Sequence, residues 1–147
     1  MSEQNKALAR RFFDQVFNNE RTEVIDELVA DSYVDHGASP GQAPGPSGAR
    51  QMYDVFRTAM PDLKVEVHEL LAEGDIVALR TTFGGTSQGP MMGAPPTGKP
   101  VQIPSMVFLR IRDGQIVERW EQADLLGLML QLGIVSTGEQ EPGGAAS

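Results

Sequence analysis

The sequence has 147 residues, which fits a single domain, and 40% of them are apolar, which is enough to build a core. Its formal net charge of −8 argues against a surface for nucleic acid or anionic membrane, because phosphate groups attract basic patches. The absence of cysteine excludes disulfides, a thiol nucleophile and a thiolate metal site. Residues 1–11 lack the apolar stretch of a secretory signal, and no run reaches membrane-spanning length, so we expect a cytoplasmic protein.

Helical periodicity predicts three helices in the first part of the chain. The first covers about residues 3–17, and the second begins near Thr22, a suitable N-cap. The third follows Ser47 and stops at Pro61. Apolar residues at helical spacing define the buried faces: Leu8, Phe12, Val16 and Phe17, then Val24, Ile25, Leu28 and Val29, then Met52, Val55, Phe56 and Ala59.

Two stretches rich in glycine and proline, residues 37–48 and 84–100, are predicted to be loops. The first follows a short segment, residues 31–36, that leaves the second helix. Because functional residues concentrate on loops, we expect both loops to form the rim of one pocket mouth.

Alternating apolar and polar residues predict four strands in the second half of the chain, at residues 63–68, 76–83, 101–112 and 116–123. Residues 72–75 form the turn of the first pair, and Asp113-Gly114 forms a hairpin turn in the second. A short helix follows at residues 125–132, with Gly133 as its C-cap.

This order of elements predicts one α+β domain over residues 1–136. We expect a curved, mostly antiparallel sheet that wraps the N-terminal helices and forms a cone, whose open end can hold a small ligand. Residues 137–147 have no apolar pattern and are predicted to be a disordered tail.

The last predicted strand has the densest polar cluster beside apolar residues. If Glu121 faces an apolar interior, its carboxyl group is placed for general acid–base catalysis, with Arg119 holding the anion. A surface ion pair is the alternative. Asp124 is either a second catalytic carboxylate or the N-cap of the following helix. Strict alternation places Val117, Arg119 and Glu121 on one face, and Ile116, Glu118 and Trp120 on the other.

Other candidate residues lie on the neighbouring strand and before the first loop. Ser105 and Val107 share a face that is apolar apart from one hydroxyl, which fits a pocket wall or a plain core face. His36, beside Tyr33 and Asp35, is either a proton shuttle or an ordinary loop histidine. The two histidines of the chain are isolated from carboxylates at ligand spacing, so no metal site is predicted.

Several motifs, taken in order over about residues 4–133, resemble one family. They are residues 33–36, 59–63, 94–101 (APPTGKPV), 108–120 (FLRIRDGQIVERW), 124–127 and 131–133. The family is the SnoaL-like polyketide cyclases, also called ester cyclases, of the nuclear-transport-factor-2-like (NTF2-like) superfamily. The resemblance implies an NTF2-like α+β barrel, usually a homodimer packed through its sheet.

The resemblance also implies cofactor-free acid–base chemistry on a small hydrophobic, polyketide-like substrate. In the cyclases, an acidic side chain on the last strand removes a proton from carbon, and intramolecular aldol attack closes a ring. The alignment places this acid at Glu121 and a second acidic position at Asp124. The expected substrate-binding residues are Tyr33, Asp35, His36, Ser105, Val107 and Trp120.

The chain departs from the aldol cyclases at three of these positions. The cyclases have His at Val107, Gln at Ser105 and Asn at Asp35. Two alternatives therefore stand beside the aldol cyclase: a hydroxylase or epoxide-opening enzyme with the same pocket, and a non-catalytic module that binds small ligands.

Overall fold

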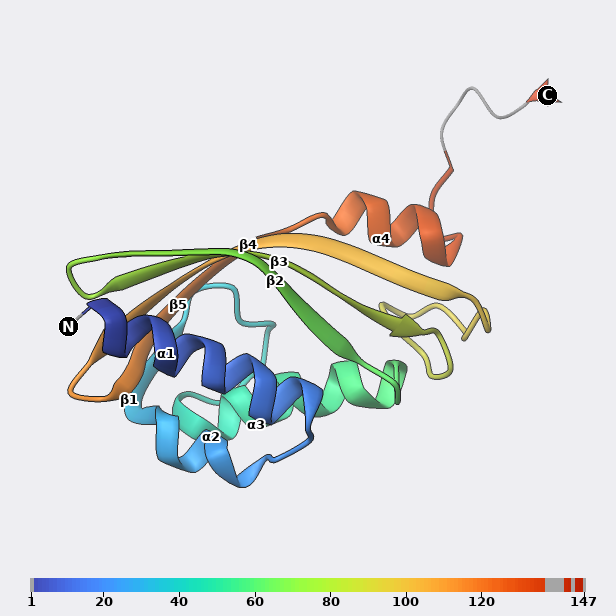
Figure 1. The fold of residues 1–147 in the computed structure, drawn as a ribbon. Helices are drawn as coiled ribbons and strands as arrows, with labels where there is room; N and C mark the ends of the chain where they lie inside the picture. The colour runs from blue at the N-terminus through green and yellow to red at the C-terminus, as the bar shows by residue number, and fades with distance from the viewer. Residues whose placement is uncertain (1, 137–141, 144, 147) are drawn as a thin grey trace.

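A curved five-stranded sheet arches over the N-terminal helices, and one further helix lies on its other side (Figure 1). The computed structural model describes residues 2–136, 142–143 and 145–146. The arrangement confirms the predicted α+β class and the curved, mostly antiparallel sheet. The predicted disordered tail falls mainly on residues outside those described.

The sheet has the strand order β1-β5-β4-β3-β2. β1 runs parallel to β5, and all other neighbours are antiparallel. β1 and β2 are therefore separate edges, so the sheet is open rather than a closed barrel. The strands are β1 (Val29–Asp35), β2 (Lys64–Glu73), β3 (Ile76–Thr86), β4 (Pro100–Arg112) and β5 (Gln115–Ala123), and two short strands, β6 (Pro142–Gly143) and β7 (Ala145–Ala146), pair with each other.

The helices are α1 (Ser2–Phe12), the π-helix η1 (Phe13–Asn18), α2 (Glu23–Leu28), α3 (Gly45–Ala59) and α4 (Leu125–Leu132). α3 begins two residues before the predicted cap, because Pro46 is compatible with a first helical turn. Gly133 ends α4 with a φ of 77°, as the C-cap prediction requires.

The first predicted helix is α1 continued by η1. The N–H of Asn19 donates to the carbonyl of Asp14, five residues earlier, at 3.0 Å. Phe13 and Phe17 of η1 are both buried, and their rings stack with centroids 5.7 Å apart. Turns of the π-helical kind are rare and occur often beside functional sites.

The segment from Val29 to Asp35 is a strand, where the sequence predicted a helix end and a short irregular stretch. Its partner β5 lies near the other end of the domain, with Asp35 opposite Arg119. A parallel partner so remote leaves no hairpin signal in the local sequence, which is why the strand was missed.

A β-bulge in β5 corrects the predicted faces of its first residues. The pairing register shifts between Arg110 and Ile111, which makes Val117 the extra residue. Ile116 therefore shares the buried face with Arg119, and it is 1% exposed. The prediction that Ile116 lies on the opposite face from Arg119 was wrong.

The two predicted loops have different surroundings. The first leaves Asp35 and returns to α3. The second packs on the end of α3, where the N–H groups of Gln88 and Gly89 donate to the carbonyl of Ala59 at 2.9 and 3.0 Å. A side chain at Gly89 would place its Cβ 2.4 Å from the carbonyl oxygen of Thr58, so this contact requires glycine.

The core lies between the concave face of the sheet and the helices. Its largest fully buried side chains include Ile25, Met60, Leu63, Ile103, Leu109, Ile111 and Ile116. None of the helices that the structure describes is long and apolar enough to span a membrane. The cytoplasmic location stays a prediction.

Candidate functional site

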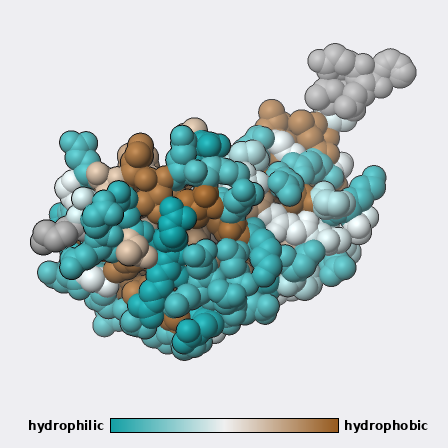
Figure 2. Space-filling view, viewed as in Figure 1, coloured by the Kyte–Doolittle hydropathy of each residue, from teal (hydrophilic) through white to brown (hydrophobic). Residues whose placement is uncertain are grey.

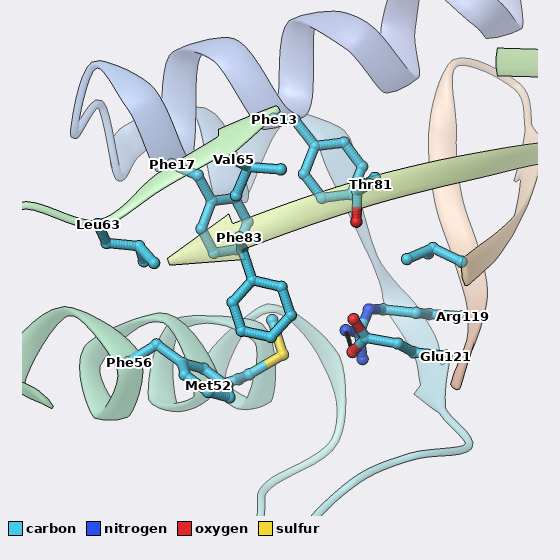
Figure 3. A pocket seen from close by; sticks show the side chains of 11 residues that line it. Phe13, Phe17, Met52, Phe56, Leu63, Val65, Thr81, Phe83, Arg119 and Glu121 are labelled. Atoms are coloured by element: carbon cyan, nitrogen blue, oxygen red, sulfur yellow. Dashed lines mark hydrogen bonds and ion pairs between the residues drawn. The ribbon is translucent and has the colours of Figure 1, made fainter. Parts of the chain in front are cut away.

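A cavity of about 30 Å³ lies between η1, α3 and the concave face of the sheet (Figure 3). Most of its wall is apolar, and one end is polar. Its lining residues are Phe13, Phe17, Met52, Phe56, Leu63, Val65, Thr81, Phe83, Val107, Arg119 and Glu121. Neither loop expected at the rim contributes a side chain to this wall.

The cavity in this conformation has room for about one water molecule, whereas sites for drug-sized ligands measure roughly 300–1,000 Å³. A polycyclic ligand can therefore occupy it only if lining side chains turn aside. Met52 and Phe56 come from α3 and face Phe83 across the cavity (Figure 3). The unbranched Met52 side chain, with three rotatable bonds, is suited to such a movement.

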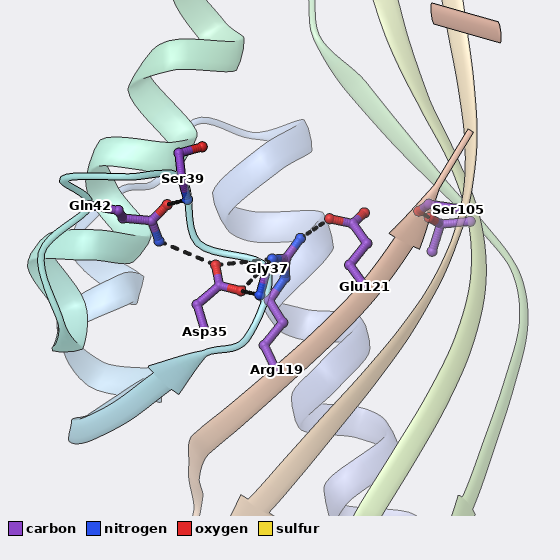
Figure 4. A network of polar contacts seen from close by, with 8 residues as sticks. Asp35, Gly37, Ser39, Gln42, Ser105, Arg119 and Glu121 are labelled. Carbon is purple, nitrogen blue, oxygen red and sulfur yellow. Dashed lines mark hydrogen bonds and ion pairs between the residues drawn. The ribbon is translucent and has the colours of Figure 1, made fainter. Parts of the chain in front are cut away.

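Arg119 links two carboxylates at the polar end of the cavity. Its Nη1 donates to both carboxylate oxygens of Asp35 at 3.1 Å, and its Nη2 donates to Oε1 of Glu121 (Figure 4). The side chains of this cluster are largely buried: Arg119 is 11% exposed, Asp35 is 4% exposed and Glu121 is 18% exposed. We call this cluster the acidic–arginine triad, and its formal charge is −1.

The sheet pairing explains why the triad forms. Asp35 is opposite Arg119 across the β1–β5 ladder, and Glu121 is two residues further along β5 on the same face. Two residues of the first loop also donate hydrogen bonds to the Asp35 carboxylate. The N–H of Gly37 donates to Oδ1 at 2.9 Å, and Nε2 of Gln42 donates to Oδ2 at 3.2 Å.

The electrostatics around Arg119 favour its charged guanidinium. Burial lowers the pKa of the Arg119 guanidinium, but the attraction of the Glu121 and Asp35 carboxylates outweighs burial and raises this pKa overall. Burial also raises the pKa of the neighbouring Tyr33 hydroxyl, and the charge of Arg119 offsets only part of this increase. Tyr33 therefore stays a neutral hydroxyl beside a charged cluster.

Ser105 and Val107 both face the interior. Val107 lines the cavity opposite Glu121 on the neighbouring strand. Ser105 is 4% exposed, and its hydroxyl lies 2.8 Å from that of Thr81. This part of the wall is thus apolar with a buried hydroxyl pair.

His36 and Trp120 lie outside the cavity, on the convex face of the sheet. Their rings stack at 4.8 Å with an interplanar angle of 10°, and Nε2 of His36 is 2.9 Å from Oε2 of Glu118. That bond, followed by the bond from Arg110, holds the pKa of the Glu118 carboxyl below its ordinary value. Alternation along β5 places Glu118 and Trp120 on the opposite face of the sheet from Arg119 and Glu121.

Asp124 caps α4. Its Oδ1 accepts a hydrogen bond from the N–H of Gly127 at 2.8 Å, and its side chain does not line the cavity. The structure thus brings Tyr33, Asp35, Val107 and Glu121 together around Arg119. It places Asp124 with the helix cap.

Sequence reasoning missed Thr81 and the side chains that the helices contribute to the cavity. Thr81 lies between Leu79 and Phe83 on a strand face that is otherwise apolar. A single hydroxyl on such a face is the sequence signal that could have indicated Thr81. Among the described residues, no group of three His, Asp or Glu side chains is placed to hold a metal ion.

Comparisons with known proteins agree with this geometry. Residues 7–132 match the family described as "SnoaL-like polyketide cyclase". The chain is 27% identical over 119 residues to the nogalonic acid methyl ester cyclase of Streptomyces nogalater, covering 80% of this chain and 89% of that protein.

Solved structures give the same fold. A proposed SnoaL-like polyketide cyclase from Jannaschia sp. CCS1 has a TM-score of 0.81 at 26% identity, covering 92% of this chain and 96% of its own. AclR from Streptomyces galilaeus, a proposed hydroxylase, has a TM-score of 0.79 at 29% identity, covering 92% of this chain and 100% of its own. With an NTF2-like sheet enclosing an apolar cavity, and a family match over most of its length, the chain belongs to the SnoaL-like polyketide cyclase family.

Proposed function

We propose that the chain catalyses an intramolecular aldol-type ring closure of a hydrophobic, polyketide-like intermediate, by general acid–base chemistry and without a cofactor. One observation carries the proposal. The Glu121 carboxylate stands at the polar end of an otherwise apolar cavity and is held in place by Arg119. The similarity to a nogalonic acid methyl ester cyclase supports the same reaction class.

In this mechanism the Glu121 carboxylate accepts a proton from a substrate carbon next to a carbonyl group. The electron pair of the broken C–H bond forms an enolate, whose carbon attacks a second carbonyl carbon of the same molecule. The new alkoxide then takes this proton from the Glu121 carboxylic acid, which returns Glu121 to its carboxylate form, and the ring is closed. General acid–base catalysis by one such group contributes typically 10²–10⁴-fold in rate.

Arg119 gives the proton transfer its electrostatic support. When Glu121 becomes neutral, the negative charge moves to the enolate, while Arg119 keeps Asp35 as its partner. The charge of the region stays the same throughout the step. Because most of the cavity wall is apolar, the guanidinium acts on the enolate in a medium of lower dielectric constant than water, where its attraction is stronger.

Hydroxylation is the second candidate function. AclR is a proposed hydroxylase, and it is as similar to this chain as the proposed cyclases are. In addition, the interior positions 105 and 107 carry Ser and Val rather than the Gln and His of the aldol cyclases. Epoxide opening by the same carboxylate and a purely ligand-binding role remain the further alternatives.

The mass of the product separates these functions. We would incubate the purified chain with nogalonic acid methyl ester and analyse the products by mass spectrometry. Ring closure gives an isomer of the substrate, or the isomer minus water, and this is the expected result. A product that gains an oxygen atom would assign the chain as a hydroxylase, and binding without conversion would assign it as a carrier.

We further propose that the chain forms a homodimer through the convex face of its sheet. Met106 is 61% exposed and Phe108 is 51% exposed on β4, beside a groove of about 610 Å³ that Trp120 also lines. In Figure 2, apolar surface gathers along the side of the molecule where the sheet and α4 lie. Burial of such a patch against a second copy would remove it from water.

A further inference from the structure

Two hydroxyl groups meet inside the apolar wall of the cavity. The Thr81 Oγ1 and Ser105 Oγ atoms are 2.8 Å apart on the neighbouring strands β3 and β4. The residues are 2% and 4% exposed, and Thr81 lines the cavity. In Figure 3, the Thr81 hydroxyl points toward the space between Phe13 and the Arg119–Glu121 pair.

A count of protons shows that this pair is incomplete. Two hydroxyl groups carry two O–H protons, and one of them lies in the bond between Thr81 and Ser105. The second proton has no acceptor among the described residues. A buried donor without an acceptor is unfavourable, so this site is suited to an acceptor atom that arrives with a ligand.

The register relates the hydroxyl pair to Glu121. Thr81 is opposite Ser105, and Ser105 is two residues from Val107, which is opposite Glu121. With strands about 4.8 Å apart and a rise of about 3.4 Å per residue, the Cα atoms of Thr81 and Glu121 are about 12 Å apart. Both side chains project into the same cavity, so a short polar segment of a ligand spans the remaining gap.

We infer that Thr81 is a further catalytic residue: its hydroxyl, oriented by Ser105, donates a hydrogen bond to the substrate carbonyl oxygen whose neighbouring carbon faces Glu121. This inference rests on the proposed ring closure. The bond strengthens when the carbonyl oxygen becomes the enolate oxygen, so it supports the transition state more than the bound substrate. Ser105 is then a positioning residue, because its hydroxyl is bonded to Thr81. Thr81 on β3 supplies the hydrogen-bond donor to the substrate, which Val107 lacks.

The kinetic test compares Thr81→Val, Thr81→Ser and Ser105→Ala with the control Thr82→Val. Thr82 is the next residue along β3 and faces the other side, where it bonds His68 at 2.8 Å. We expect Thr81→Val to lower kcat roughly 10- to 100-fold with a smaller change in KM, and Thr81→Ser to restore most of it. Ser105→Ala should lower kcat less, and Thr82→Val should leave it unchanged.

A second measurement does not depend on turnover. Acetophenone labelled with carbon-13 at its carbonyl is added to each variant, and the carbonyl stretch is followed by infrared difference spectroscopy. A bound band at lower wavenumber in the native chain and in Thr81→Ser, lost in Thr81→Val, supports the hydrogen bond from Thr81 to a ligand carbonyl, independently of ring closure. If no shifted band forms in the native chain, or if Thr81→Val keeps native kcat while turnover still requires Glu121, the inference is wrong and the proposed function stands.

Discussion

Arg119 holds two carboxylates at once on the inner face of the sheet. Asp35 and Glu121 come from strands that meet only in the folded chain, and either carboxylate alone would neutralise the guanidinium. Breaking a buried ion pair is costly when it leaves an uncompensated charge, typically about 3–5 kcal/mol. The cost of a substitution in the triad therefore depends on how many charges it leaves unpaired.

This dependence predicts an order of stability among variants. Arg119→Met leaves two buried carboxylates without a cation, so we expect a loss of about 3–5 kcal/mol in the free energy of unfolding. Asp35→Asn keeps Arg119 paired with Glu121 and removes only charge-assisted hydrogen bonds, so we expect about 1.5–3 kcal/mol. Urea unfolding measures both. Equal losses, or a larger loss for Asp35→Asn, would show that the triad does not share one cation.

Alternation along the last strand predicted part of this arrangement. Period-two patterning correctly grouped Arg119 with Glu121, because both lie beyond the bulge. It failed for Ile116, since a single extra residue reverses the faces on one side of a bulge. The contact between Asp35 and Arg119 could not be predicted from local pattern, because it depends on a parallel pairing between remote segments.

At the scale of elements, the antiparallel part of the fold was the most predictable. The β4–β5 hairpin has its turn at Asp113-Gly114, and both residues have positive φ, 51° and 76°. β1 and η1 were missed for a common reason. Neither a strand with a remote partner nor a widened helical turn has a distinct apolar period, so tertiary packing decides them.

Asp124 is the N-cap of α4, where its carboxylate accepts a hydrogen bond from the N–H of Gly127. We expect Asp124→Ala to destabilise the chain by about 1 kcal/mol and to leave kcat unchanged, since the carboxylate acts as an N-cap. Asp124→Asn is the matched control and should keep native stability, because Asn caps equally well. Thermal unfolding and turnover are measured on both. A large loss of kcat in Asp124→Asn, with native stability, would make Asp124 a catalytic residue.

At the scale of the whole molecule, the two faces of the sheet differ in kind. The concave face encloses the cavity and the triad, whereas the convex face exposes Met106 and Phe108 beside the stacked rings of His36 and Trp120. Alternation along β5 and the pairing of β1 with β5 thus divide the predicted site residues between the cavity and the convex face.

The convex face gives a prediction about assembly. We expect the native chain to be a dimer in solution, and Phe108→Glu to shift it to monomers, because each copy would bury a charge at the contact. Val55→Glu is the control, since Val55 is 61% exposed on α3, away from that face. Light scattering after size-exclusion chromatography gives the masses. A native monomer, or a Phe108→Glu variant that stays dimeric, would contradict this assembly.

In the proposed mechanism, the Glu121 carboxylate performs the proton transfer. The most direct test of this role is the turnover of Glu121→Gln beside Glu118→Gln, a matched change on the same strand but on the convex face, with both folds checked by circular dichroism. We expect Glu121→Gln to lower kcat roughly 10²–10⁴-fold and Glu118→Gln to leave it near the native value. A folded Glu121→Gln variant with native turnover would contradict the claim.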